Sequence, residues 1–172
     1  DPAGLVADLK SAIALNTAYQ EQYHVTKAKL AAMNASGNGS TRQFEGFVAE
    51  AEVFAKFDLF AVRAAKLIDL FSTIHQFRTL AENKIEGMEY VAKEFDTMFA
   101  DFQRKRHDLL AFSNNQFDRD FVAFNRQISK LEALLQRFID SSFAQCSDSI
   151  EHSLELLSKF EKIIERDSLK AD

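Results

Sequence analysis

A long apolar stripe within residues 115–146 constrains the fold of this chain more than any other feature. Its members are Phe117, Phe121, Phe124, Ile128, Leu131, Leu135 and Phe138. The spacing alternates between four and three residues, and a helix places residues three and four apart on one face. Neither proline nor glycine interrupts the segment. A helix of roughly 28 residues is about 42 Å long, so a stripe of this length requires partner helices for its burial.

Comparable spacing elsewhere predicts four further helices, over about residues 4–33, 41–80, 85–106 and from 148 onward. The last of these has the expected apolar stripe Ile150, Leu154, Leu157, Phe160 and Ile164. One proline and five glycines are too few turn residues for a sheet protein of 172 residues. We therefore predict an all-α fold, an elongated bundle of about five long antiparallel helices with coiled-coil-like packing.

Three parts of the chain differ in character. Residues 1–34 are expected to form a peripheral N-terminal helix, because its inward stripe is half polar and includes Asn16, Gln20 and Lys27. Residues 35–41 are rich in glycine, serine and asparagine and are expected to be a flexible connector. Residues 42–172 are expected to form the helical bundle. The segment 107–113 is apolar for a loop, and we expect Leu109, Leu110 and Phe112 to be tucked under the end of the bundle.

Composition excludes several classes of partner. The net charge of −5 comes from mixed signs and provides no basic face for nucleic acid. The basic cluster Arg104–His107 fits the C-terminal end of a helix, where cations complement the helix dipole. No apolar run approaches the roughly 20 residues of a membrane span. The single cysteine, Cys146, excludes an internal disulfide and fits a reducing compartment such as the cytoplasm; we expect it to be a small buried side chain.

No motif in the sequence indicates catalysis, a cofactor or a metal. The stretch SGNGST at residues 36–41 lacks the lysine, the spacing and the preceding strand of a phosphate-binding loop. Glu21 and His24 form one E-x-x-H pair, whereas di-metal bundles require two such pairs. We therefore expect no catalytic, cofactor-binding or metal-binding residues. The residues expected to bind a partner are Tyr19, Gln22 and Tyr23, since their helix is too polar for a dry core and still offers aromatic area.

Several sequence runs resemble the N-terminal tail of dynein heavy chains, and they are most similar to the axonemal outer-arm type. They are FDLF (57–60), KIEGME (84–89), NNQFDRDF (114–121) and ISKLE (128–132), in this order. The resemblance covers about residues 53–170 well and the first helix more loosely. It also fits our expectation, from the chain's ends, that this sequence is a piece of something longer.

The resemblance implies a non-catalytic structural segment, with the ATPase of the parent motor elsewhere. It implies as partners other dynein heavy chains, intermediate and light chains, and docking proteins on doublet microtubules. The implied location is the cytoskeleton of the ciliary or flagellar axoneme, and the parent motor would drive beating. An alternative is a free-standing helical adaptor or spectrin-like spacer unrelated to a motor. A helical-bundle enzyme or metal carrier is a third hypothesis, disfavoured by the missing second E-x-x-H pair.

Overall fold

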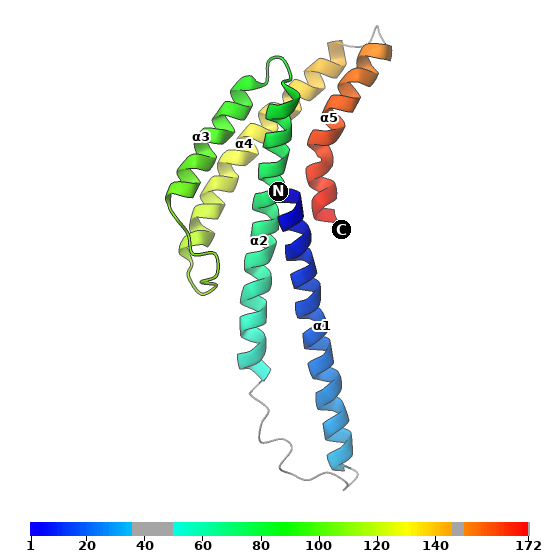
Figure 1. The fold of residues 1–172 in the computed structure, drawn as a ribbon, viewed down its shortest axis with the longest axis vertical. Helices are drawn as coiled ribbons and strands as arrows, with labels where there is room; N and C mark the ends of the chain where they lie inside the picture. The colour runs from blue at the N-terminus through cyan, green and yellow to red at the C-terminus, as the bar shows by residue number, and fades with distance from the viewer. Residues whose placement is uncertain (36–49, 146–149, 172) are drawn as a thin grey trace.

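A computed structural model of the chain describes residues 1–35, 50–145 and 150–171, and these residues form five helices and no strand. The helices are α1 (Pro2–Ala35), α2 (Glu50–Asn83), α3 (Glu89–Arg104), α4 (Gln116–Gln145) and α5 (Ile150–Ala171). Consecutive helices run in opposite directions along an elongated molecule (Figure 1). The all-α prediction is confirmed. The expected connector, apart from Ala35, and the single cysteine Cys146 lie outside the described residues, and the division into three parts stays a prediction.

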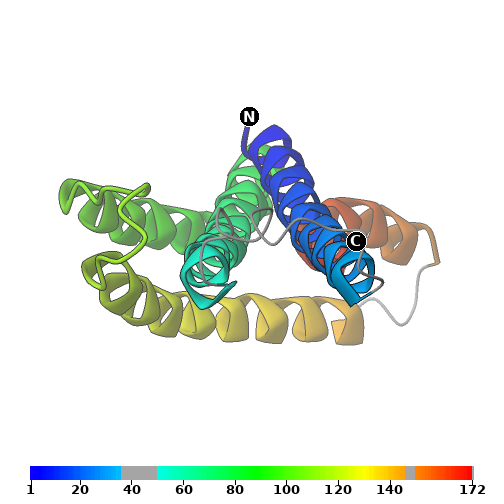
Figure 2. The same ribbon diagram turned by 90° about the horizontal axis from the view of Figure 1, so that it is seen from below.

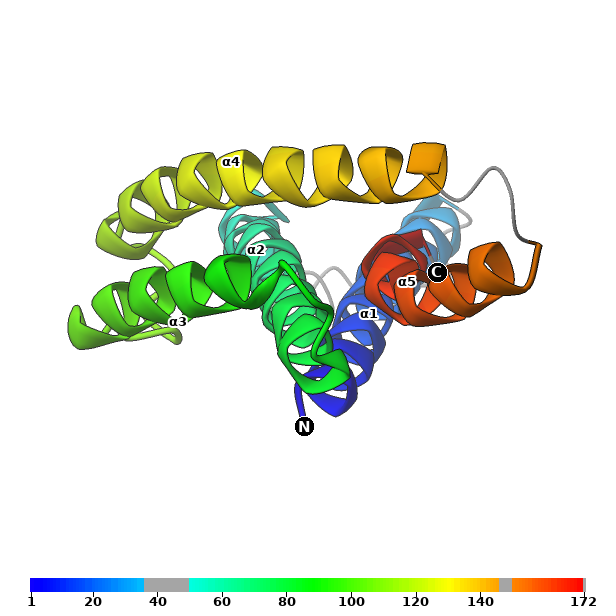
Figure 3. The same cartoon turned by 90° about the horizontal axis from the view of Figure 1, so that it is seen from above.

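Helix α2 is the centre of the assembly. It packs against α1, α3 and α5, whereas α4 packs mainly against α3. The C-terminal part of α4 also contacts α5, where the rings of Phe138 and Phe143 lie near that of Phe160. Figures 2 and 3 show α4 passing across one side of α2 to reach α5. The lower parts of α1 and α2 extend beyond the other helices as a two-helix arm (Figure 1). The helix with the cleanest apolar stripe, α4, therefore covers the centre of the fold and is not itself that centre.

The main core lies between α2, α3 and α4 and is rich in phenylalanine. The rings of Phe77 and Phe95 stack with centroids 4.5 Å apart and planes 6° apart. The first six members of the stripe on α4, Phe117 to Leu135, are all buried, while Ile139 takes the next buried position and Phe138 is half-buried. Burying a side chain of this size contributes about 1.5–3 kcal/mol. The expectation that Phe117, Phe121 and Phe124 form core is confirmed.

The contact between α1 and α2 is more polar than the main core, as the half-polar stripe of α1 indicates. Val6 and Asn16 are buried, whereas Leu9 and Ile13 on the same face are half-buried. The Asn16 side-chain amide donates a hydrogen bond to the backbone carbonyl of Phe57, at 3.2 Å. A buried amide that bonds to one particular carbonyl fixes how two helices align along their length.

The break expected near residues 81–84 is confirmed, since α2 ends at Asn83 and a turn leads into α3. Lys84 and Gly87 have φ values of 44° and 89°, the left-handed region that glycine tolerates best. The backbone N–H of Gly87 donates to Glu89 Oε2 at 3.0 Å. A Cβ at Gly87 would lie 3.2 Å from the Phe138 ring. The turn therefore brings backbone close to α4 where only glycine fits without strain.

Two expectations about buried apolar residues were wrong. Leu110 is 79% exposed, although Leu109 and Phe112 beside it are half-buried as expected. On α5, Ile150, Leu154 and Leu157 are 81%, 59% and 52% exposed, and of the stripe expected there only Phe160 is described as buried. Leu156, one residue from Leu157, packs on the core in its place. Helix α5 carries two overlapping apolar series, and the neighbouring one faces the bundle.

Candidate functional site

The connector between α3 and α4, residues 105–115, is held by a buried arginine of α2. The Arg63 guanidinium donates to the backbone carbonyls of Asp108 (3.4 Å), Leu109 (3.2 Å), Ala111 (3.4 Å) and Asn114 (3.0 Å). The side chain of Arg63 is only 2% exposed. Guanidinium suits this role because its donors form a rigid planar fork that remains charged. One side chain thereby supplies hydrogen-bond donors to four backbone carbonyls of an irregular segment.

The same arginine also connects α2 to the start of α4. Its Cζ lies 4.6 Å from the centroid of the Phe117 ring, and Nη2 lies 3.8 Å from Asp118 Oδ2. Lys66, almost one turn along α2, contacts Asp118 Oδ1 at 2.6 Å. Asp118 lies in the first turn of α4 and pairs there with two cations of α2. Sequence reasoning missed Arg63, since nothing marks it as different from an exposed arginine.

A second polar cluster joins the end of α3 to α4. Asp120 accepts hydrogen bonds from Gln116 Nε2 (2.9 Å), Lys105 Nζ (2.6 Å) and His107 Nε2 (2.8 Å). These bonds, that of Gln116 foremost, hold the pKa of the Asp120 carboxyl well below its ordinary value of 3.8. The His107 ring packs against Phe102 and Phe117, with centroids 4.8 Å and 5.5 Å away. The basic cluster therefore does lie at a helix end, and it binds a carboxylate of the next helix.

The three residues expected to bind a partner lie in the middle of α1. Tyr19 is 60% exposed, and Gln22 is exposed with its amide 3.3 Å from Thr26 Oγ1. Tyr23 is half-buried, with its ring edge-on to Phe54 of α2 at 5.1 Å. Tyr19 and Gln22 therefore share an accessible surface, whereas part of the Tyr23 side chain is buried in the contact between α1 and α2.

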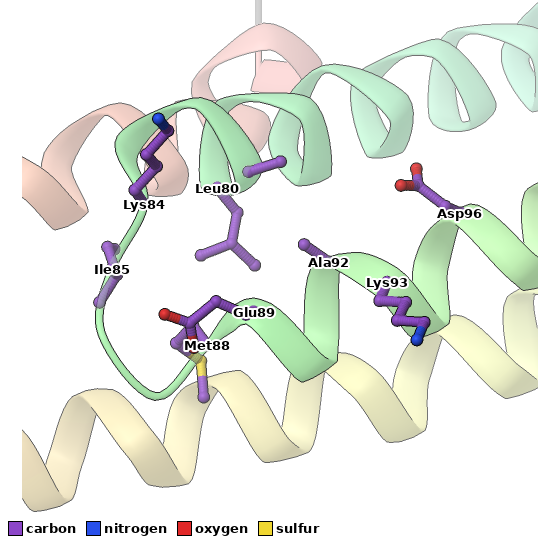
Figure 4. A pocket seen from close by; sticks show the side chains of 9 residues that line it. Leu80, Lys84, Ile85, Met88, Glu89, Ala92, Lys93 and Asp96 are labelled. Atoms are coloured by element: carbon purple, nitrogen blue, oxygen red, sulfur yellow. The ribbon is translucent and has the colours of Figure 1, made fainter.

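A cavity of about 250 Å³ lies where α2 turns into α3 (Figure 4). Its apolar wall comes from Leu80, Ile85 and Met88, which belong to the main core. Its rim carries both signs of charge, with Lys84 and Lys93 opposed by Glu89 and Asp96. Balanced charge over core side chains gives no preference for an anion or a cation, and we assign no ligand to this cavity.

The described part of the chain holds no group of three or more histidine, cysteine, aspartate or glutamate side chains placed to bind a metal. Glu21 and His24 are both exposed on α1, where His24 contacts the Phe54 ring at 5.1 Å. None of the described helices combines the length and the apolarity that a membrane span requires.

The fold thus defines the class of protein: an all-α chain of paired long helices, in which a buried arginine and several ion pairs join the helices to one another and to a connector. Comparison with known proteins gives the family. The family model described as "Dynein heavy chain, N-terminal region 1" matches residues 1–172, and the chain belongs to this family. It corresponds to the N-terminal region of axonemal dynein heavy chains.

Individual relatives agree with this assignment. The chain is 40% identical over 173 residues, its whole length, to the dynein gamma chain of the flagellar outer arm of Chlamydomonas reinhardtii. It is 33% identical over 155 residues, 90% of the chain, to dynein axonemal heavy chain 5 of Rattus norvegicus. It is 30% identical over 129 residues, 70% of the chain, to the dynein beta chain of the Chlamydomonas reinhardtii flagellar outer arm. The chain spans only 3–4% of the length of these three relatives.

Proposed function

We propose that this chain is a non-catalytic structural segment of an axonemal outer-arm dynein heavy chain. The parent protein would be an ATP-hydrolysing microtubule motor that drives ciliary or flagellar beating, with its ATPase modules elsewhere. The observation that supports this proposal most is that the charged groups between the helices serve to connect them. Arg63 and Asp120 are engaged in joining helices and a connector. Polar groups used in this way stabilise the arrangement of helices, as a structural segment requires.

In this proposal the segment helps heavy chains associate and helps dock intermediate and light chains or docking proteins on doublet microtubules. The surface proposed for docking surrounds Tyr19 and Gln22 on α1, with Tyr23 at its edge. Leu15 and Val25 are exposed beside them, so the accessible side of this helix is apolar as well as aromatic. Exposed aromatic and aliphatic area without dense charge is typical of the centre of protein interfaces.

Co-sedimentation of the heavy chain tests the docking surface. The full heavy chain carrying Tyr19→Asp is expressed with its outer-arm partners, and the complex is separated on a density gradient. We expect the variant to lose an intermediate chain, a light chain or a second heavy chain from its peak. Tyr90→Asp on α3 is the matched control, because Tyr90 is similarly exposed, at 63%. An unchanged complex in the Tyr19 variant, or equal losses in both variants, would contradict the assignment of this surface.

A further inference from the structure

All the lysine and arginine side chains of α4 lie on one face of the helix. They are Arg119, Arg126, Lys130 and Arg137, and each is exposed. At about 100° per residue, the other three lie within roughly 40° of Lys130, and the row is about 27 Å long. We call this row the basic stripe. Figures 2 and 3 show α4 along one margin of the molecule, with no described helix on its far side, so the stripe is open to a partner.

The carboxylates of α4 lie off this face. They are Asp118, Asp120, Glu132 and Asp140, and each is at least about 80° around the helix from Lys130. Lys66 contacts Asp118 at 2.6 Å, and Lys105 contacts Asp120 at 2.6 Å. Within the described residues, no side chain of the basic stripe forms an ion pair with a carboxylate. The positive charge of the stripe is therefore not neutralised by its own helix.

The surroundings of the stripe also leave it positive. Asp140, which is exposed, accepts a hydrogen bond from Gln136 at 2.8 Å and stands beyond the end of the stripe. Helix α3 packs beside α4 and carries exposed charges of both signs, so it adds no net field of its own. Arg126 and Lys130 stand four residues apart, a spacing at which like charges destabilise a helix. An anion from outside the chain would relieve this repulsion.

We infer that the basic stripe binds an acidic segment of another polypeptide through its aspartate or glutamate side chains. Three of the four cations are arginines, whose planar guanidinium matches a carboxylate with two parallel hydrogen bonds. Arg119 and Arg126 are seven residues apart, as are Lys130 and Arg137, which corresponds to about 10.5 Å along the axis. A partner helix that carries a carboxylate in every heptad has the same spacing.

Other kinds of partner fit the stripe less well. Duplex nucleic acid carries about one negative charge per 1.7 Å, whereas the stripe offers four cations over about 27 Å. A membrane surface would require an apolar face beside the cations, and the apolar face of α4 is buried in the core. The stripe lies on a different helix from the surface around Tyr19, so either proposal can fail without the other.

Two designed peptides test the inference directly. Both are helical and three heptads long; one carries two glutamates in each heptad, and the other carries glutamine at the same positions. Fluorescence anisotropy of each labelled peptide is followed while the 172-residue chain is added. We expect saturable binding of the glutamate peptide, about tenfold or more tighter than that of the glutamine peptide. Binding should weaken at about 0.5 M salt, because salt screens exposed charges.

Variants of the chain locate the binding. Arg126→Gln together with Lys130→Gln should weaken binding of the glutamate peptide by about fivefold or more. Lys29→Gln together with Lys56→Gln is the matched control, because both lysines are exposed on α1 and α2 and the net charge changes equally. The control should bind within about twofold of the parent chain. The α4 variant should melt no lower than the control, since it removes a pair of like charges.

Several results would overturn the inference: equal affinity for both peptides, equal weakening by the two double variants, or a melting temperature lowered only in the α4 variant, which would give the cations a structural role. A labelled DNA duplex of the same net charge as the glutamate peptide tests the alternative polyanion. Tighter binding of the duplex would make the stripe a nucleic-acid site. Sedimentation of the chain alone tests a second copy as occupant, and a dimer that dissociates in the α4 variant would also overturn the inference.

Discussion

The guanidinium carbon of Arg63 lies 4.6 Å from the centroid of the Phe117 ring. The flat cation thus has an aromatic face on one side while its N–H groups reach carbonyl oxygens of the connector at its edge. A desolvated contact of this kind contributes about 2 kcal/mol. Phe117 also begins the core stripe of α4, so this pair links the polar connector to the apolar core.

Replacing Arg63 should destabilise the connector and the whole fold. Arg63→Met keeps much of the apolar bulk and removes every donor, leaving the carbonyls of Leu109 and Asn114 without this partner. We expect a loss of about 2–3 kcal/mol in the free energy of unfolding, measured by urea denaturation. Arg63→Lys should recover less than half of that loss, because an ammonium cannot reproduce a planar fork. Full recovery by lysine would contradict the proposed geometry.

Arg119→Met is the matched control for this experiment. Arg119 lies on α4 and its side chain is exposed. Its replacement should change the free energy of unfolding by no more than about 0.5 kcal/mol, as is usual for surface substitutions.

Phe121→Ala should cost much more stability than the loss of an exposed ring. Phe121 is buried and its ring stacks on Phe117 at 5.7 Å. Truncating a buried phenylalanine costs about 3–5 kcal/mol because a cavity remains. The control is Tyr90→Ala, which removes an exposed ring from α3 and should leave the melting temperature nearly unchanged. Similar melting temperatures for both variants would mean that the stripe on α4 is not core.

Two glycine substitutions should have opposite effects. Gly87→Ala forces a Cβ into the left-handed region and to within 3.2 Å of the Phe138 ring, so we expect a loss of about 1–3 kcal/mol. Gly4→Ala lies within α1 and meets only the flexible side chain of Asp1, so it should be neutral or stabilise by up to about 1 kcal/mol. Thermal melting of both variants measures this contrast. A tolerant Gly87 would show that the turn relaxes away from Phe138.

The Asp120 cluster should make stability depend on acid pH. The folded chain lowers the pKa of Asp120 below its ordinary 3.8, so the folded state favours the ionised carboxylate. Its contribution is fully present above the unfolded pKa and is lost as the pH falls through and below it toward the folded pKa. Asp120→Asn should therefore be less stable than the parent chain at neutral pH, and the difference should shrink below about pH 4.

Urea denaturation of both chains at a series of pH values measures this effect. Asp101→Asn is the control, because Asp101 is exposed and pairs with the equally exposed Arg104 at 3.0 Å, and such surface pairs contribute little to stability. A difference between the parent chain and Asp120→Asn that stays constant down to pH 3 would contradict the role assigned to the cluster.

The sequence was a good guide where one apolar series dominates a helix. On α4 the residues opposite Phe121 and Ile128 are charged, so only one face could be buried, and it is. On α5 leucines stand at both 156 and 157, which makes two series possible. Packing against α2 and α4 decides between them, and this information is absent from the spacing. The expected stripe on α5 therefore failed for a physical reason.

The polar framework was less predictable than the core. Arg63 stands one residue before the buried Ala64, yet arginine in a helix is usually solvated and the sequence offers no sign that it is buried. Its partners are backbone carbonyls some 45–51 residues further along the chain, and carbonyls leave no signature in a sequence. Asp118 and Asp120 stand near the start of α4, but their cationic partners depend on how α2 and α3 dock against α4.

The hydrogen bond from Asn16 to the Phe57 carbonyl has a mechanical consequence. Displacing α1 by one helical turn would move Asn16 about 5.4 Å along α2 and break this bond before the apolar contacts had re-formed. An interface of apolar side chains alone has little preference for one alignment along the helices, whereas this hydrogen bond favours a single alignment of α1 and α2. Sliding of α1 along α2 therefore breaks this hydrogen bond in addition to the apolar contacts between the two helices.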